Sequence, residues 1–388
     1  MDKTPKNGVM IAFGELFLKS EGVKKLFQKR LVDNLRFFLA KNTVDFKLFL
    51  LRERIFIETE QPKAVIKVLK NIFGISWFAE CLYFPESDLK EFGDFVDKNY
   101  HNWIKSRETF AINLKMSDVS SSTSLATKEV IERIARRIDR KVNLNNPKKE
   151  LSIEIRKQGW FLYFKKQRAQ GGLPFGASGR VLVLMSGGID SPVAAHLISK
   201  RGAENVWLHF HSFPLVSNKS IEKIKEIARI FSSYQAHLKI YFVPISRAQV
   251  EIKTKAPAGY RILLYRRLMF RIAEAIAKKE RCKALVTGES LGQVSSQTLQ
   301  NITIVSDAIR MPVFRPLIAM DKEEIIKLAE QIKTYEISIK PHEDCCTLFT
   351  PKHSTADGKL EVVKELEKKL NIKKIVAGIT KEIKVMVQ

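Results

Sequence analysis

The segment VLVLMSGGIDSPVAA, residues 181–195, constrains the fold of this chain more than any other. Its apolar run up to Met185 predicts a buried strand, and the apolar pattern that resumes at Pro192 predicts a helix. The glycines between them let backbone amides come close to an anion, because glycine has no Cβ to obstruct the approach. The start of a helix adds partial positive charge. The segment therefore predicts a phosphate-binding loop, here called the glycine loop (residues 186–191).

Apolar strands and amphipathic helices keep alternating after this loop. NVWLHFHSF precedes SIEKIKEIARIFSSY, and LKIYFVPI precedes a helix around YRRLMFRIAEAIAKKE. This rhythm predicts an α/β domain over residues 180–388, in which a doubly wound parallel sheet has helices on both faces. Ligands of such sheets bind at the carboxyl ends of the strands, which is where the glycine loop falls.

The first half of the chain has a different pattern. Residues 9–76 indicate a strand, a helix, two strands and a helix, which is the beginning of a split βαβ module. A second α+β module continues to residue 167 and ends in two alternating strands that turn at Gln158-Gly159. Four glycines and a proline in RAQGGLPFGASGR predict a linker over residues 168–179.

The chain is strongly basic. It carries 67 lysines and arginines against 42 acidic residues, which gives a net charge of +25. Residues 128–168 alone hold 13 basic and 5 acidic residues. Because a basic surface gains affinity for a polyanion by releasing counterions, nucleic acid is the leading candidate partner. A lysine-rich surface of the thermophile kind is the alternative.

Neither a membrane segment nor a disulfide framework is indicated. No run of about 18 uncharged apolar residues occurs, and the N-terminus MDKTPKNGVM lacks the apolar core of a signal peptide. Cys81, Cys282, Cys345 and Cys346 have neither disulfide nor CxxC spacing. These features predict a soluble cytoplasmic protein that does not bind membranes.

The glycine loop is not a Walker motif, because no GxxxxGK[ST] occurs in the chain. Its sequence SGGIDS instead resembles the PP-loop, SGGxDS, of ATP pyrophosphatases, which hold the pyrophosphate of ATP and form an adenylate. This resemblance implies that the chain binds ATP. Ser186 and Ser191 would donate to phosphate oxygens, and the Asp190 carboxylate beside the phosphates would bind Mg²⁺.

Two further segments extend the resemblance along nearly the whole chain, TGESLGQVSSQTLQN at 287–301 and EDCCTLFTPKHSTA at 343–356. With the basic first half, they make the chain similar to the tRNA uracil 4-sulfurtransferases, in the short form without a rhodanese domain. The resemblance implies a ferredoxin-like domain at 1–60, a THUMP domain at 61–167 and a PP-loop domain at 180–388.

The resemblance also implies the reaction. ATP adenylates the C4 oxygen of a uridine in tRNA, and sulfur from a cysteine persulfide then displaces AMP to give 4-thiouridine. Sulfur transfer for the thiamine thiazole is the family's second role. The sulfur source would be a cysteine desulfurase or free sulfide, because a rhodanese domain is not expected.

The same resemblance implies the residues of the site. Cys346 would carry the sulfur, although Cys345 and Cys346 are alternatively a pair of small buried residues. Lys322 would stabilise charge on the adenylate or be a first-turn surface lysine. Asp190 completes the implied catalytic set. The implied ATP-binding residues are Leu184, Met185, Ser186, Gly187, Gly188, Asp190, Ser191, His209, Phe210, Arg266, Gly288 and Gln297, with a solvated helix face as the alternative for Arg266.

The basic stretch supplies the predicted RNA contacts. On its hairpin, Trp160, Phe161, Tyr163 and Phe164 are expected to pack inward while the lysines face solvent, because alternate residues of a strand face opposite sides. Phosphate contacts place an RNA without reading its sequence. The predicted RNA-binding residues are Arg133, Arg136, Arg137, Arg140, Lys141, Lys157, Lys165 and Lys166.

Two other functions fit parts of this pattern. A PP-loop synthetase of the GMP synthetase kind would adenylate a small molecule for attack by ammonia. A noncatalytic tRNA-binding protein would need only the basic surface. The oligomeric state stays open, with a homodimer as one alternative.

Overall fold

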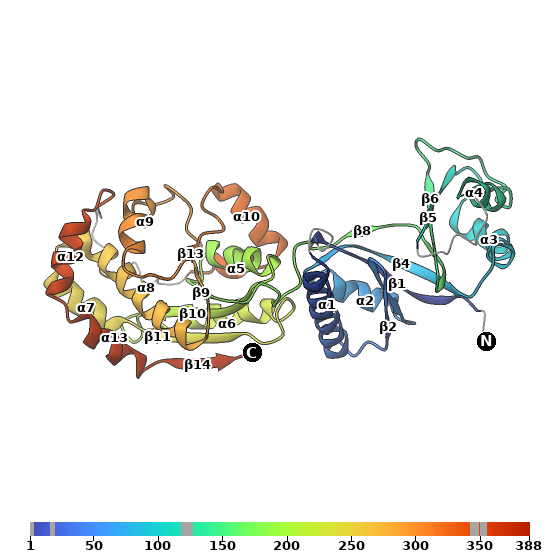
Figure 1. Ribbon diagram of the computed structural model, residues 1–388. Coiled ribbons are helices and arrows are strands. Elements are labelled where there is room, and N and C mark those ends of the chain that lie inside the picture. The colour runs from blue at the N-terminus through green and yellow to red at the C-terminus, as the bar shows by residue number, and fades with distance from the viewer. Residues whose placement is uncertain (1–3, 16–19, 118–126, 342–348, 350–354) are drawn as a thin grey trace. The chain divides into compact units, whose positions relative to one another are not determined.

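The computed structural model describes residues 4–15, 20–117, 127–341, 349 and 355–388. It divides into two compact units, Met1–Leu173 and Pro174–Gln388 (Figure 1). None of the described helices is long and apolar enough to cross a membrane.

The first unit is built on one sheet in the order β2-β3-β1-β4-β7-β6-β5, and β8 pairs with β4. Its elements are β1 (Lys6–Phe13), α1 (Glu21–Lys41), β2 (Lys47–Leu51), β3 (Arg54–Glu58), α2 (Pro62–Leu69), β4 (Ile75–Pro85), α3 (Leu89–Trp103), β5 (Phe110–Met116), α4 (Thr127–Ala135), β6 (Lys149–Arg156), β7 (Gly159–Tyr163) and β8 (Gln167–Arg168).

Strand β4 joins the two halves of this sheet and is drawn as one continuous arrow in Figure 1. Residues 75–83 of the strand pair with β1, and residues 81–85 pair with β7. Apolar residues of α1 and α2, such as Leu35 and Leu69, cover one face of the half that contains β1. The two α+β modules that the sequence predicts therefore share one sheet.

The predicted hairpin is present as β6 and β7, but both of its faces are buried. Trp160 stacks on Phe92 with ring centroids 4.6 Å apart, whereas Phe161 contacts Phe56 on the other face at 5.3 Å. The predicted burial of Trp160, Phe161 and Tyr163 is confirmed, but these side chains pack on both faces of β7 rather than on one, because Phe56 of β3 covers the second face. The lysines nevertheless reach solvent, since they lie in the turn and after the strand, at Lys157, Lys165 and Lys166.

The second unit contains a sheet in the order β13-β12-β9-β10-β11-β14. Its elements are β9 (Arg180–Leu184), α5 (Asp190–Lys200), β10 (Glu204–His211), α6 (Lys219–Phe231), β11 (Lys239–Pro244), α7 (Ser246–Lys255), η2 (Ala258–Tyr260), α8 (Arg261–Lys279), β12 (Leu285–Val286), η3 (Ser295–Gln297), α9 (Leu299–Ser306), β13 (Val313–Phe314), α10 (Lys322–Gln331), α11 (Tyr335–Ser338), α12 (Leu360–Lys368), α13 (Ile372–Thr380) and β14 (Lys384–Val387).

Strands β9 to β13 pair in parallel, which confirms the predicted doubly wound α/β fold. The chain runs outward from β9 through β10 to β11, and α8 then returns it to β12 on the other side of β9. The carboxyl end of β9 therefore lies at the topological switch point, where doubly wound sheets bind ligands. The glycine loop begins there.

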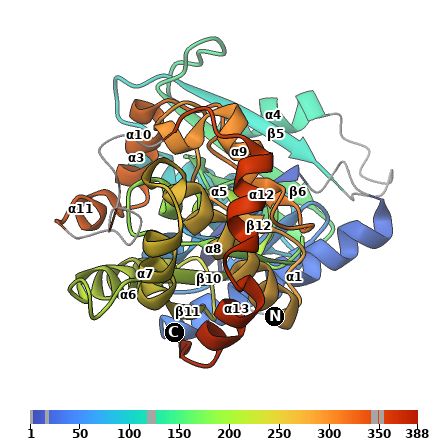
Figure 2. The same ribbon diagram turned by 90° about the vertical axis from the view of Figure 1, so that its left-hand side faces the viewer.

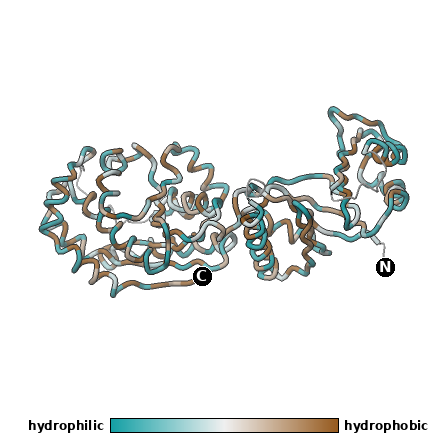
Figure 3. The backbone as a smooth tube through the Cα atoms, in the orientation of Figure 1, coloured by the Kyte–Doolittle hydropathy of each residue, from teal (hydrophilic) through white to brown (hydrophobic). Residues whose placement is uncertain are grey.

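Helices cover both faces of this sheet. Leu268 of α8 and Leu366 of α12 belong to the core on one face, and both views show α12 beside α8 (Figures 1 and 2). On the other face, Trp207 contacts Phe231 of α6 with ring centroids 4.8 Å apart. Hydrophilic and hydrophobic residues alternate along the helices in Figure 3, as expected for helices with one buried face.

The sequence pattern does not predict the last strand. β14 pairs antiparallel with β11 at the edge of the sheet. It has four residues, and Val385 and Val387 are exposed. An alternation this short is no stronger than the pattern of many loops, so its pairing depends on the neighbouring strand rather than on a local signal.

Candidate nucleotide site and RNA-binding surface

The glycine loop connects β9 to α5, which begins at Asp190, two residues before the predicted start. Gly187 has a φ of 83°, a left-handed conformation that favours glycine. The backbone N–H of Ser186 donates to Ser191 Oγ at 3.1 Å, and that of Gly188 donates to Ser186 Oγ at 3.3 Å. The two serines thus hold the loop closed around the start of α5, whose first-turn amides have no intrahelical acceptors.

The Asp190 carboxylate is contacted from two other segments. Lys322 Nζ donates to its Oδ1 at 2.7 Å, and Gln293 Nε2 donates to its Oδ2 at 3.3 Å. Lys322 is the first residue of α10, which is capped by a reciprocal pair of hydrogen bonds between Asp321 and Glu324. Lys322 is therefore a first-turn lysine, 44% exposed, and also the ion-pair partner of Asp190.

Gly288 lies between β12 and the start of α5. A Cβ atom on this residue would lie 2.8 Å from the carbonyl carbon of Asp190 and from the backbone nitrogen of Ser191. Glycine is therefore required for this approach. Gln297 closes the same loop, because its Oε1 accepts from the backbone N–H of Ser290 at 3.0 Å.

Arg266 extends from α8 to the loop that follows β12. Its guanidinium forms an ion pair with Glu289 and donates to the Ser296 carbonyl. Glu289 also accepts from Arg315 Nε at 2.7 Å and from Thr287 Oγ1 at 2.8 Å. Burial lowers the pKa of Arg315. Two arginines and one carboxylate leave one excess positive charge at the carboxyl ends of β12 and β13.

His209 links β10 to the strand end before the glycine loop. Its Nδ1 lies 2.8 Å from the Met185 carbonyl and its Nε2 lies 3.1 Å from Ser220 Oγ. Nδ1 carries a proton, because a carbonyl oxygen only accepts. Phe210 belongs to the core on the face covered by α8, and the half-buried Leu184 packs against the same core. The structure therefore places His209 beside the loop and Phe210 within the core.

Apart from Phe210 and Leu184, which lie in or against the core, the residues implied for ATP binding gather at one edge of the sheet, around the ends of β9, β10 and β12. Sequence reasoning missed three residues there: Gln293, Glu289 and Arg315. The first two lie inside TGESLGQVSSQTLQN and the third follows β13, so the motif and the strand ends were the available signals. Cys346, with Cys345, lies outside the described residues.

Mg²⁺ usually binds one or two carboxylates together with substrate phosphates. Within the described ranges, no group of three His, Cys, Asp or Glu side chains could hold a metal ion by itself. The Asp190 carboxylate, 24% exposed at the glycine loop, fits an ion that phosphate oxygens help to hold.

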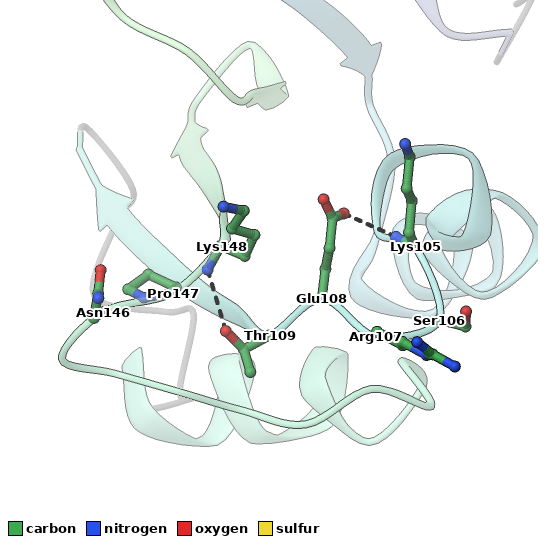
Figure 4. A pocket seen from close by; sticks show the side chains of 8 residues that line it. All are labelled: Lys105, Ser106, Arg107, Glu108, Thr109, Asn146, Pro147 and Lys148. Carbon is green, nitrogen blue, oxygen red and sulfur yellow. Dashed lines mark hydrogen bonds between the residues drawn. The ribbon is translucent and has the colours of Figure 1, made fainter.

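The first unit holds a basic pocket of about 520 Å³, lined by Lys105, Ser106, Arg107, Glu108, Thr109, Asn146, Pro147 and Lys148 (Figure 4). The backbone N–H of Lys148 donates to Thr109 Oγ1 at 3.2 Å, and that of Lys105 donates to Glu108 Oε2 at 2.9 Å. Arg140 lies beside this pocket, since its Nε donates to the Lys105 carbonyl at 3.2 Å. The three cationic lining residues were not among the predicted RNA contacts.

The predicted RNA contacts fall into two groups. Arg137 forms an ion pair with Asp94 at 2.5 Å, and the guanidinium of Arg140 lies 5.1 Å from the ring centroid of Tyr100, so both arginines also support the fold. The other predicted side chains are exposed, namely Arg133, Arg136, Lys141, Lys157, Lys165 and Lys166. Two of these six also have partners within the unit, since Arg133 pairs with Glu129 at 2.5 Å and Lys166 Nζ lies 5.3 Å from the ring centroid of Trp77.

The sheet and the loop at its switch point define the second unit as a nucleotide-binding α/β domain. The model of the family described as Thiamine biosynthesis protein (ThiI) matches residues 176–372, the ThiI ferredoxin-like domain matches residues 8–79, and the THUMP domain matches residues 87–165. The chain belongs to this ThiI family. The domain boundaries given above remain predictions.

Known relatives match along most of the chain. A probable tRNA sulfurtransferase of Caldanaerobacter subterraneus subsp. tengcongensis is 37% identical over 384 residues, which cover 97% of this chain and 99% of that protein. A probable tRNA sulfurtransferase of Thermus thermophilus is 49% identical over 245 residues, 63% of this chain and 60% of that protein. The solved structure of a 4-thiouridine synthetase in complex with RNA and bound ATP has 31% identity and a TM-score of 0.88, covering 98% of this chain and 99% of that one.

Proposed function

We propose that this chain is an ATP-dependent tRNA sulfurtransferase that converts a uridine of tRNA to 4-thiouridine. The observation that carries the proposal is Asp190 at the start of α5, which contacts Lys322 and Gln293 at the switch point of the sheet. The relatives named above support the same reaction, because they are named as tRNA sulfurtransferases or as a 4-thiouridine synthetase. They favour it over an ammonia-using synthetase and over a noncatalytic RNA-binding protein.

In the first half of the reaction, the glycine loop and the cation of Arg266 bind the phosphates of ATP. The C4 oxygen of the uridine attacks the α-phosphorus, and pyrophosphate leaves. Lys322 stabilises the negative charge that develops on the α-phosphate oxygens. Asp190 holds Lys322 in place and would hold Mg²⁺ together with the phosphates, and the ion would supply further charge neutralisation when bound.

In the second half, a sulfur nucleophile attacks C4 and AMP departs with the former C4 oxygen. AMP is a good leaving group because its phosphate already stabilises the negative charge. Cys346 is the proposed carrier, and the terminal sulfur of its persulfide is the attacking atom. A thiol then reduces the bond between the Cys346 sulfur and the transferred sulfur, and this thiol is itself oxidised. Free sulfide needs no reductant, since its sulfur already has the oxidation state of the product.

The proposed sulfur source is a cysteine desulfurase, with free sulfide as its chemical substitute. A second activity, sulfur supply for the thiamine thiazole, is supported by the family's description as thiamine biosynthesis protein. A homodimer remains a prediction that light scattering at several protein concentrations can test.

The first unit binds tRNA phosphates, and a uridine flipped out of the RNA reaches the glycine loop. The exposed predicted side chains form one part of the proposed RNA-binding surface. The basic pocket around Lys105, Arg107 and Lys148 forms another, because its cations exceed its single carboxylate.

The test is mass spectrometry of unmodified tRNA incubated with the protein, ATP, Mg²⁺, a cysteine desulfurase and cysteine. One uridine should gain the mass difference between sulfur and oxygen, and AMP should form. Asp190→Ala should abolish AMP formation, because it removes the carboxylate that holds Lys322. Cys346→Ser should abolish thiolation, whereas Cys345→Ser is the matched control that keeps it.

Each failure has its own meaning in this experiment. Thiolated tRNA from the Cys346→Ser protein with desulfurase-derived sulfur would remove Cys346 from the mechanism. The proposed function would be rejected if the wild-type protein formed no thiolated tRNA either with the desulfurase and cysteine or with free sulfide in their place.

A further inference from the structure

A buried carboxylate lies between two arginines at the edge of the nucleotide site. The Glu289 side chain is 6% exposed, and the side chains of Arg266 and Arg315 are 13% and 15% exposed. A buried charge is costly unless it is paired and hydrogen-bonded, so this arrangement holds all three side chains together. Arg315 is fixed further by a bond from its Nη2 to Ser306 Oγ at 2.9 Å.

The backbone that carries Glu289 is itself fixed against the site. Gly288, the preceding residue, abuts the backbone of Asp190 and Ser191. Beyond Glu289, Ser290 Oγ donates to the Met320 carbonyl at 2.8 Å, two residues before Lys322. The backbone that carries Glu289 is therefore fixed in position relative to the glycine loop on one side and relative to the start of α10 on the other.

An arginine on a helix has many side-chain rotamers, and an anion site works best when its cations are oriented before the ligand arrives. Glu289 and the Ser296 carbonyl restrict the Arg266 guanidinium to one orientation. The cluster of Arg266, Glu289 and Arg315 keeps one net positive charge, so the carboxylate orients the arginines without cancelling their attraction for phosphate.

We propose that Glu289 is a positioning residue that acts through Arg266 to orient its guanidinium for the phosphates of ATP. The inference deepens the proposed function and rests on it. Glu289 is not proposed to touch substrate, and Arg315 serves as the second partner that holds the carboxylate in place.

Helix α8, which carries Arg266, also takes part in a second cluster away from the site that serves as a matched control. Glu367 of α12 also bridges two arginines of α8, since Arg267 Nε and Nη2 donate to it at 2.9 Å and 3.0 Å and Arg271 forms a second ion pair with it. Its side chain is 10% exposed. Glu367 has no contact with the glycine loop, so its removal reports the structural cost of losing such a cluster.

The experiment measures Mg²⁺·ATP affinity by calorimetry, AMP formation with tRNA, and thermal unfolding of the full-length protein. The variants are Glu289→Gln, Glu289→Asp, Arg266→Met, the Arg266→Met/Glu289→Gln double variant and Glu367→Gln. Glu289→Gln and Glu289→Asp should each weaken ATP binding by about tenfold or more, because a small misplacement of a positioned group has large effects. The double variant should bind ATP no more weakly than Arg266→Met alone, whereas Glu367→Gln should lower the unfolding temperature and keep wild-type ATP affinity.

The proposal would be overturned if Glu289→Asp bound ATP with wild-type affinity. It would also be overturned if the double variant lost ATP affinity by a factor equal to the product of the two single-variant factors. Glu289→Asp keeps the charge and decides the question if Glu289→Gln does not fold. A wild-type protein that forms no thiolated tRNA would reject the proposed function, whereas normal wild-type turnover with unchanged Glu289→Asp affinity would reject only the role of Glu289.

Discussion

At the residue scale, the contacts around the start of α5 leave no room for a side chain at Gly288. Backbone atoms of Asp190 and Ser191, rather than flexible side-chain ends, occupy the space that a Cβ would need. The glycine loop and the loop after β12 can therefore meet at this distance only while one of them lacks a side chain. The separation of the proposed phosphate-binding groups depends on that contact.

Gly288→Ala is expected to reduce AMP formation by about 100-fold, because the new methyl group pushes the two loops apart. It should lower the free energy of unfolding by about 1 to 3 kcal/mol, as overpacking of an interior site does. Steady-state kinetics with ATP and tRNA, together with urea unfolding, measure both effects.

Gly378 of α13 is the matched control, because a Cβ on it would meet nothing within 4 Å. Gly378→Ala should keep activity and stabilise the protein by about 0.5 to 1 kcal/mol, since alanine favours a helix interior. Equal activity of the two alanine variants would contradict the role assigned to Gly288.

At the scale of single elements, α5 combines the glycine loop with a buried histidine. His196 is 5% exposed and lies edge-on to Tyr234, with ring centroids 5.1 Å apart. Burial, with the nearby Lys200 charge, lowers the pKa of His196 to about 4 from its ordinary value of 6.5. The folded protein therefore resists protonation of this ring across a pH range in which the unfolded chain accepts the proton.

The sign of the pH effect follows from this difference. Between pH 6.5 and about 4 the unfolded state binds more protons, so stability is present above that window and is lost as the pH falls through it. In His196→Leu this loss should disappear. The difference in unfolding free energy between wild type and variant should change by about 3 kcal/mol from pH 7 to pH 4. Parallel stability curves for the two proteins would contradict the assignment.

The elements near the glycine loop could be predicted because each one has a local signal. The apolar run of β9 and the proline near the start of α5 come directly from the sequence. The pairing of Arg266 with Glu289 could not be predicted in this way, because it joins α8 to a loop whose position depends on the return of the chain to β12. β14 and the second buried face of β7 escaped prediction for the same reason, since both depend on strands distant in the sequence.

At the scale of the whole molecule, the excess positive charge determines how strongly a polyanion binds. A protein that neutralises phosphates releases counterions, so its affinity for RNA falls steeply with salt. In the first unit, Lys105 and Lys148 line the basic pocket, and both are exposed. The pocket is therefore expected to contribute to affinity for any tRNA rather than to selection of one sequence.

Replacing Lys105 and Lys148 with glutamine should weaken tRNA binding uniformly and reduce the slope of log affinity against log salt by about 1.5 to 2, because two phosphate contacts are lost. Filter binding over a range of salt concentrations measures the slope. Lys368→Gln is the control, since this α12 lysine is paired with Glu365 at 2.5 Å. A slope unchanged by the double replacement would remove the pocket from the RNA-binding surface.

The continuity of β4 has a consequence for the evolution of chains like this one. A genetic crossover within this strand would leave each product with a long unpaired edge, which invites aggregation. The ferredoxin-like and THUMP pieces should therefore be inherited together as one block. Exchange of whole segments with other proteins is expected to succeed at the glycine-rich junction around residues 171–179. Chimeras joined at this junction should express as folded protein, whereas chimeras joined inside β4 should not.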